Sequence, residues 1–286
     1  MEKKWHRRNI SELIIKILMA VSFAIVICSL GMIVWTVLSK GLPALTLDMI
    51  TKTPKGGYYL GKEGGILNAI LGSLLLASGG TILALLFSLP TALFLETYSK
   101  NTIWGSQVRL ALDVLWGIPS IVYGAFGFII MLAIGLRASL LGGILTLALL
   151  ELPIMTRAMD EVIRQTPRDL TRAALALGVT KAELAFQIIV RQTIPGMVTA
   201  VLLAFGRGIG DAASVLFTAG YTDRIPNSLL RPAASLPLAV FFQLSVPFPE
   251  VQQRAYASAL ILTFLVLFIS IISRLIAWRM NKFTIK

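Results

Sequence analysis

Residues 166–183 read TPRDLTRAALALGVTKAE and interrupt an otherwise apolar chain with two helix starts. Thr166 can cap the free N–H groups of a first helix, and the proline after it fits the first helical position. Gly178 can adopt the left-handed conformation that ends this helix. Thr180 and Glu183 then have the spacing of a capping box, which predicts a second helix start. The stretch is therefore predicted to form two short helices in succession.

The first of these helices has a narrow apolar face with small residues at its centre. Leu170, Ala173, Ala174 and Leu177 recur at helical spacing. Such a face suits a helix that lies on its own protein, but it also suits a docking helix around which a groove of another protein closes. The spacing alone leaves both interpretations open. The second helix is expected to run towards Pro195.

Outside this stretch the composition is that of a membrane protein. The chain has 286 residues, of which 56% are apolar and only 14% are charged, far from the balance of a soluble domain. Apolar runs of roughly 20 residues can cross a bilayer, and they predict an all-α polytopic membrane protein with six transmembrane helices. Pro90 and Pro119 are expected to kink or end their helices. The predicted spans lie near residues 13–38, 66–89, 109–134, 139–157, 196–219 and 257–278.

The positions of the basic residues predict the orientation. A net charge of +12 would suggest nucleic-acid binding in a soluble protein. With the N-terminus inside, however, the inside segments carry about twice as many Lys and Arg residues as the outside ones, as the positive-inside rule requires. Both termini and residues 157–195 are therefore predicted to be cytoplasmic, and residues 39–65 and 221–255 external. The apolar segment 236–244 is too short to span and is expected to lie at the membrane edge or to re-enter.

The sequence holds no arrangement typical of an enzyme or a metal site. His6 is the only histidine and Cys28 the only cysteine, which excludes a metal cluster of the usual His/Cys type and any internal disulfide. The N-terminal apolar run is too long for a signal peptide and is expected to remain as the first span. No Ser-His-Asp, Cys-His or Walker-type arrangement occurs, so enzymatic chemistry is not expected on this chain.

The fifth predicted span contains two charges in the segment GRGIGD, residues 206–211. A charge at mid-bilayer costs about 2.5–3.5 kcal/mol, so Arg207 is expected to face the protein interior or a water-filled path. Asp211, four residues later, is expected to pair with it. Two interpretations stay open: a structural ion pair, or a guanidinium that contacts an anion in transit, for which its planar fork suits phosphate. Asp113 and Glu151 are expected near the ends of their spans, without a role.

The spacing Ala-Ala-x3-Gly-x9-Ile, at residues 173–188, resembles the cytoplasmic EAA loop of ABC-importer permeases. That loop couples the membrane subunit to its ATPase. Arg172 stands in place of the motif's Glu, and Arg191 in place of its final Pro. The second difference is shared by the phosphate-importer branch of the family.

Further stretches resemble the same phosphate-importer branch. Residues 64–73 (GGILNAILGS) and 117–124 (GIPSIVYG) look like segments of its permeases, as does the pattern of Leu-Pro, Phe, Pro-Phe and Gln-Gln within residues 236–253. Arg207-x-x-Gly210-Asp211 is similar to the family's Arg-x-x-Gly-Glu, with Asp in place of Glu. Together these stretches extend the resemblance over about residues 64–278.

The resemblance implies the six-helix fold of type I ABC-importer permeases, also called MetI-like, in a bacterial or archaeal cell membrane. It implies an N-terminal segment with the first helix and an external loop at 1–63, a permease domain at 64–280, and a cytoplasmic tail at 281–286. The coupling loop would be about residues 157–195. The predicted sites are a substrate path with Arg207 and Asp211, and an ATPase-coupling face with Leu170, Ala173, Ala174, Leu177 and Gly178.

The resemblance also implies partners. A PstC-like permease would form a heterodimer with this chain within membrane lipid, a PstB-like ATPase dimer would bind the cytoplasmic loop, and an extracytoplasmic binding protein would deliver inorganic phosphate. ATP and Mg would bind the ATPase, so this chain would carry no cofactor, and nucleic acid is not expected as a partner.

Other functions stay open at this point. Arg207 suits any oxyanion, so the cargo could instead be sulfate or molybdate. A secondary transporter without an ATPase would be expected to have two related halves with broken helices, and the sequence has no such internal symmetry. A non-transporting scaffold would leave Arg207 unexplained.

Overall fold

The computed structural model describes residues 2–55 and 64–280, with side chains from residue 12 onward except at 277 and 280. The regular structure of this part of the chain is helical. The predicted tail at 281–286 lies outside the described residues. The helices are α1 (Glu2–Ala44), α2 (Leu47–Thr51), α3 (Leu67–Thr97), α4 (Ile103–Gly117), α5 (Ser120–Ala133), α6 (Leu140–Arg164), α7 (Arg168–Ala176), α8 (Lys181–Glu183), the π-helix η1 (Leu184–Ile189), α9 (Val190–Gly210), α10 (Leu236–Leu244) and α11 (Pro249–Met280).

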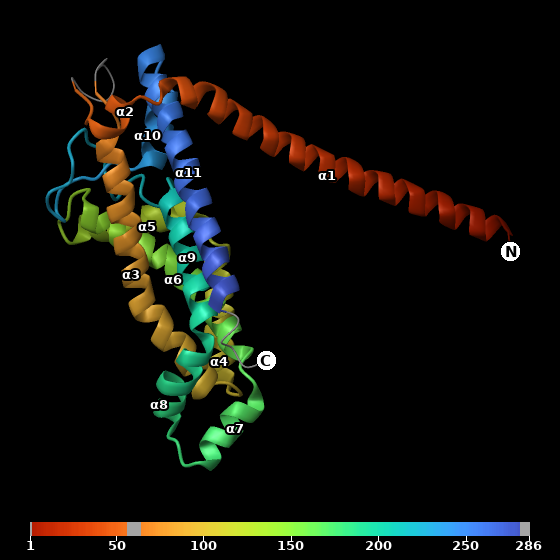
Figure 1. Cartoon of the computed structure of the whole chain (residues 1–286). Coiled ribbons are helices and arrows are strands. Elements are labelled where there is room, and N and C mark those ends of the chain that lie inside the picture. The colour runs from red at the N-terminus through yellow and green to blue at the C-terminus, as the bar shows by residue number, and fades with distance from the viewer. Residues whose placement is uncertain (1, 56–63, 281–286) are drawn as a thin grey trace.

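The all-α polytopic prediction is confirmed, because five single helices are long and apolar enough to cross a membrane. These are α1, α3, α6, the continuous helix from Lys181 to Gly210, and α11. Figure 1 shows α3, α6, α9 and α11 running along one another as a bundle, while α1 projects away from it. The apolar window of α1 is wholly exposed in the single chain, so lipid or another subunit has to cover it.

The third predicted span, 109–134, is a broken one, and with it the candidate spans number up to six among the described residues. Its residues belong to α4 and α5, two helices bent by 99° at a short break. Ile118 and Pro119 are both extended, with ψ of 131° and 137°. The ring of Pro119 disfavours a helical conformation at Ile118, and the proline has no N–H for an internal helical hydrogen bond. The expectation that Pro119 ends a helix is therefore confirmed, and its effect is to turn the chain rather than to kink it.

The fifth predicted span, 196–219, has different ends in the structure. Its helix begins at Lys181 and passes through η1 and Pro195 without a stop, so the predicted boundary at Pro195 is wrong. Pro195 is tolerated as prolines are in membrane helices, where neighbouring groups satisfy the freed backbone. The helix ends at Gly210, because Asp211 is extended, with φ −85° and ψ 119°. Residues 211–219 form turns instead of the last two helical turns.

Small residues on α3 determine how closely the bundle packs. Cβ atoms at Gly79 and Gly80 would overlap the side chains of Ile144 and Leu147 on α6. These glycines therefore let the two helices approach until their backbones nearly touch, which is the usual way membrane helices gain packing contacts. The pair α3 and α6 forms the centre of the structure, and α9 packs on both.

The short apolar segment 236–244 is confirmed as a helix that does not span. It forms α10, which begins with Ser235 as a cap, the Ser235 Oγ accepting from the Leu238 N–H. Its first residue is fixed inside the protein, because the Leu236 N–H donates to Ser73 Oγ on α3 at 2.7 Å. Leu236 and Leu238 are fully buried. The segment is therefore anchored inside the protein and packs beside α11 (Figure 1).

Candidate functional site

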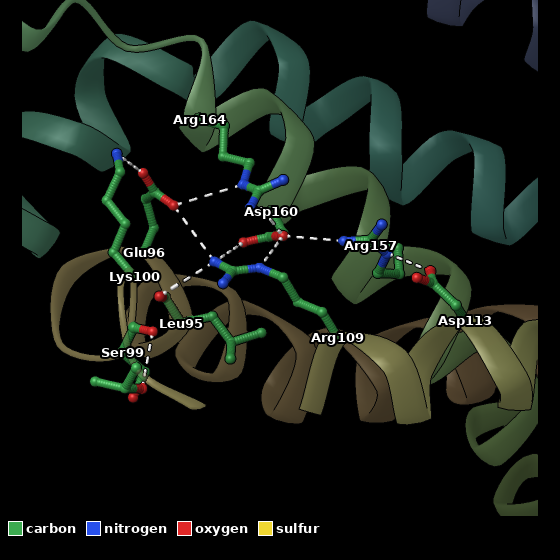
Figure 2. A network of polar contacts seen from close by, with 10 residues as sticks. Leu95, Glu96, Ser99, Lys100, Arg109, Asp113, Arg157, Asp160 and Arg164 are labelled. Atoms are coloured by element: carbon green, nitrogen blue, oxygen red, sulfur yellow. Dashed lines mark hydrogen bonds and ion pairs between the residues drawn. The ribbon is translucent and has the colours of Figure 1, made fainter. Parts of the chain in front are cut away.

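A buried ion pair joins α4 to α6 at the end of the bundle next to α7. The guanidinium of Arg109 binds the carboxylate of Asp160 with two hydrogen bonds, Nε to Oδ2 at 2.8 Å and Nη2 to Oδ1 at 3.0 Å. Arg109 Nη2 also lies 3.2 Å from the Leu95 carbonyl oxygen at the end of α3. Figure 2 shows the guanidinium between the three helices. Asp160 is fully buried and Arg109 nearly so, so each charge depends on the other.

More charges surround this pair and extend it sideways. Arg157 donates to Asp160 at 3.1 Å and to Asp113 on α4 at 2.6 Å. The carboxylate of Glu96 on α3 accepts from Lys100 and lies 3.4 Å from Arg109. Arg164 approaches it at 3.8 Å. We call this set the charge network; it consists of Glu96, Lys100, Arg109, Asp113, Arg157, Asp160 and Arg164.

Sequence analysis missed the charge network. It counted the basic members only as part of the positive-inside charge bias, and it expected Asp113 to lie near the end of a span without a role. A signal was present. Arg157, Asp160 and Arg164 follow one another at spacings of three and four residues, which places them on one face of a helix. Arg109 and Asp113 have the same relation on α4. Two helix faces with alternating charge favour an interhelical ion-pair array.

The turn after α7 has the predicted structure, but the start of α7 does not. Gly178 has φ +84° and ends α7. Thr180 and Glu183 form the predicted capping box, in which the Thr180 N–H donates to Glu183 Oε2 at 2.9 Å and the Glu183 N–H donates to Thr180 Oγ1 at 3.3 Å. Thr166, by contrast, does not cap α7. Pro167 is the residue before the helix, and no side chain caps the first turn.

The predicted coupling face divides between two environments. Ala174 is buried in a cluster with Leu184 of η1, and Leu170 is half-buried. Ala173 and Gly178 are exposed, and the side chain of Leu177 is 85% exposed. Helix α7 therefore lies on its own protein with one side and leaves the other uncovered. The role of these residues in docking an ATPase stays a prediction.

The predicted ion pair between Arg207 and Asp211 is absent. Asp211 lies beyond the end of α9, and its Oδ1 accepts from the Ser214 N–H at 2.8 Å. The spacing of four residues does not bring the two together, because the helix ends between them. Within the described part of the chain, no hydrogen bond or ion pair to Arg207 is found, and its side chain is exposed.

A different carboxylate lies beside this part of α9. Glu151 was expected near the end of a span, but it is fully buried on α6. Thr81 on α3 donates to its Oε2 at 2.8 Å. Its other oxygen, Oε1, lies so close to Gly208 that a Cβ there would overlap it. The residue at position 208, next to Arg207, must therefore be a glycine to leave room for the carboxylate of Glu151. Among the described residues, no three His, Cys, Asp or Glu side chains are grouped to hold a metal ion.

Comparison with known families decides the class of protein. Residues 88–282 match the family described as binding-protein-dependent transport system inner membrane component. The chain belongs to this family. Solved structures agree with the predicted MetI-like fold, which is confirmed. A chain of the inward-facing MetNI methionine ABC transporter superposes with a TM-score of 0.60 at 15% identity, over 75% of this chain and 95% of that chain. A chain of an amino acid ABC transporter with histidines has a TM-score of 0.56 at 18% identity, over 75% and 93%.

Curated relatives in this transport-component family cover nearly the whole chain. The phosphate transport system permease protein PstA of Haemophilus influenzae is 31% identical over 264 residues, which are 91% of this chain and 92% of that protein. PstA of Xylella fastidiosa is 34% identical over 86% of this chain and 85% of that protein. PstA 1 of Mycobacterium tuberculosis is 31% identical over 94% of this chain and 90% of that protein.

The charge network predicts a large loss of stability when its central cation is removed. Arg109→Met leaves Asp160 buried without its bidentate partner, and we expect a destabilisation of about 3–5 kcal/mol. Arg164→Met is the matched control, because the Arg164 side chain is 42% exposed and its shortest ion-pair distance is 3.8 Å; its cost should stay below about 1 kcal/mol. Thermal unfolding in detergent measures both. Equal losses would mean that burial of the pair does not matter.

The contact between Glu151 and Gly208 predicts a second difference. Gly208→Ala forces the Glu151 carboxylate away from its place beside α9, and we expect a loss of about 1–3 kcal/mol from overpacking. Gly206→Ala is the control two residues earlier, where a Cβ meets nothing within 4 Å; better helix propensity should leave it neutral or up to about 1 kcal/mol more stable. Thermal unfolding again gives the comparison. A Gly208→Ala protein as stable as Gly206→Ala would contradict it.

Proposed function

We propose that this chain is the membrane-spanning permease subunit of an ATP-driven phosphate importer. The observation that carries the proposal is the similarity, at 31–34% identity over most of the chain, to proteins described as phosphate transport system permease protein PstA. The exposed guanidinium of Arg207 supplies the chemistry, since its planar fork can bind two phosphate oxygens at once.

The exposure of Arg207 supports a second permease as a partner. A guanidinium of a membrane-spanning helix that faced lipid would be costly, and in the single chain this side chain is exposed. A PstC-like subunit covering this side of α9 would enclose Arg207 in a path between two permeases. This chain then supplies half of the path, and an extracytoplasmic binding protein delivers the anion to it. Asp211 stabilises the turn after α9 by accepting from the Ser214 N–H. It lies four residues after Arg207, so we place it beside the same path.

The uncovered side of α7 supports coupling to a PstB-like ATPase dimer. This side consists of one large and two small exposed residues, Leu177, Ala173 and Gly178. Such a surface suits a groove that closes around a helix end. Ala174 holds the helix against η1, and Leu170 is half-buried. ATP and Mg bind the ATPase, so hydrolysis takes place on the partner and this chain carries no cofactor.

The orientation follows from the charge bias and is tested by thiol labelling. In a Cys28→Ala background, single cysteines at Thr53 and Ser228 should react with an impermeant thiol reagent in intact cells or spheroplasts. A cysteine at the exposed Lys181 should react only after the membrane is permeabilised. Labelling of the Lys181 position alone in intact cells would reverse the orientation.

The path residue is tested by phosphate uptake. Arg207→Gln removes charge-assisted hydrogen bonds worth about 1.5–3 kcal/mol, so uptake should fall roughly 10- to 100-fold. Arg207→Lys should retain part of the activity, because it keeps the charge but not the fork. Unfolding temperatures of both should match the wild type, since Arg207 has no partner within the described chain that the change could orphan.

Two controls define the outcome of the uptake experiment. Arg274→Gln removes an exposed Arg of α11, outside the proposed path and the coupling loop, and should leave uptake unchanged. Competition with sulfate and molybdate distinguishes the cargo, because a guanidinium alone does not select among oxyanions. Wild-type uptake in a stable Arg207→Gln complex, or uptake that needs no associated ATPase, would overturn the proposal.

A further inference from the structure

A pocket of about 680 Å³ opens between the turn that joins α3 to α4 and the two helices α7 and η1. Its apolar lining consists of Ile163 from α6, Leu175 from α7, and Leu184 and Ile189 from η1. Three of these are buried, while Leu175 is 44% exposed. The pocket thus offers an apolar surface next to the coupling helix, large enough for several side chains.

The remaining lining of the pocket is strongly basic. Lys100, Arg168, Arg172 and Lys181 come from three separate segments and are all exposed. The one acidic residue among the lining residues is Glu96. Its carboxylate is already bound by Lys100 and lies in the charge network. The pocket therefore carries an excess of positive charge that the described chain does not neutralise.

Apart from Lys100, which pairs with Glu96, the basic side chains are engaged only loosely within the chain. The single ion pair of Arg172 is at 3.8 Å to Asp169, whose side chain is 97% exposed and lies outside the lining. Lys181 lies over the ring of Tyr98 at 5.5 Å, and no hydrogen bond or ion pair to Arg168 occurs among the described residues. Charges this exposed contribute little to the stability of the fold. Their clustering around one pocket is therefore better explained by a negatively charged ligand that binds there.

We propose that this pocket receives a segment of the ATPase subunit in which acidic side chains stand next to an apolar one. The proposal rests on the coupling role proposed above for α7, which contributes Arg168, Arg172 and Leu175 to the pocket. The apolar residue of the segment packs against Leu184 and Ile189. Its carboxylates bind the guanidinium groups in bidentate fashion, as Arg favours.

The sequence difference at Arg172 agrees with this complementarity. The loop motif that this stretch resembles has Glu at that position, whereas this chain has Arg. A partner suited to the chain must then present negative rather than positive charge there. The occupied pocket would also connect α7 with the α3–α4 turn, where Lys100 contacts Glu96 of the charge network. Docking would thus act on the helix bundle at two points instead of one.

An anionic phospholipid is the competing occupant, because four basic side chains at a membrane surface also suit a phosphate headgroup. The position of α7 favours the protein segment. In Figure 1, α7 lies at the end of the molecule, beyond the ends of α3 and α11. Half of the basic lining is on α7, so a headgroup in the membrane plane would leave part of it unused.

The test is the affinity of the ATPase subunit for the purified permease pair, measured at about 50 mM and about 200 mM salt. Arg168→Glu combined with Arg172→Glu should weaken binding at least roughly tenfold at low salt and remove most of the salt dependence. Both changes lie on an exposed helix surface, and Glu at Arg168 suits the first turn of α7, so the variant should fold with the wild-type unfolding temperature. Arg274→Glu combined with Arg279→Glu is the matched control on α11, outside the pocket, and should change affinity less than about twofold.

A photo-crosslinker at Leu175 identifies the segment. Capture of an ATPase peptide with acidic residues, and recovery of affinity when those residues are changed to Lys in the complex with the double variant, is the expected result. Wild-type affinity of the double variant overturns the pocket proposal while the coupling role stands. Loss of bound anionic phospholipid in native mass spectrometry, with ATPase affinity unchanged, assigns the pocket to lipid and overturns it as well. Failure of the wild-type pair to bind any ATPase would instead refute the proposed function itself.

Discussion

The bidentate ion pair between Arg109 and Asp160 is the contact on which the arrangement of the bundle end next to α7 depends. Helix α4 is short and bent away from α5, so apolar packing along a full span cannot hold it in place. Two buried hydrogen bonds to α6 and one to the end of α3 do so instead. Because α7 follows α6 after three residues, the same contact determines where α7 lies. A buried charge is costly unless it is paired, which makes this arrangement specific.

Much of the fold could be predicted because its causes are local. Membrane spans follow from the length of apolar runs, and the turn after α7 follows from Gly178 and the capping box at Thr180. Thr166 does not cap α7 because Pro167 occupies the N-cap position. Thr166 therefore lies one residue before the position from which a side chain could cap the helix. The 99° bend at Pro119 could be predicted as a helix end but not as an angle, since tertiary packing sets the angle.

The polar residues of the membrane part were predicted less well, because their partners come from other helices. Arg207 and Asp211 have the right spacing for a pair, yet the helix ends between them. Glu151 has no partner within a few residues, and only the approach of α3 and α9 explains its burial. The two glycines beside Arg207 also differ in a way that depends on contacts with other helices. A Cβ at Gly208 would overlap Glu151, whereas Gly206 faces open space.

The last part of the predicted coupling loop, residues 181–195, and the predicted path residue Arg207 belong to one continuous helix. It begins with the capping box at Thr180 and runs for 30 residues from Lys181 to Gly210, about 45 Å at 1.5 Å per residue. Arg207 lies in its last turn, and Leu184, against which α7 packs, lies in the second turn. The π-helix η1 sits between α8 and α9, where an extra residue per turn loosens the hydrogen-bond register. Because α7 packs against this helix at Leu184, the docking proposed for α7 would act on the helix that carries Arg207, with the irregular segment η1 between the two positions.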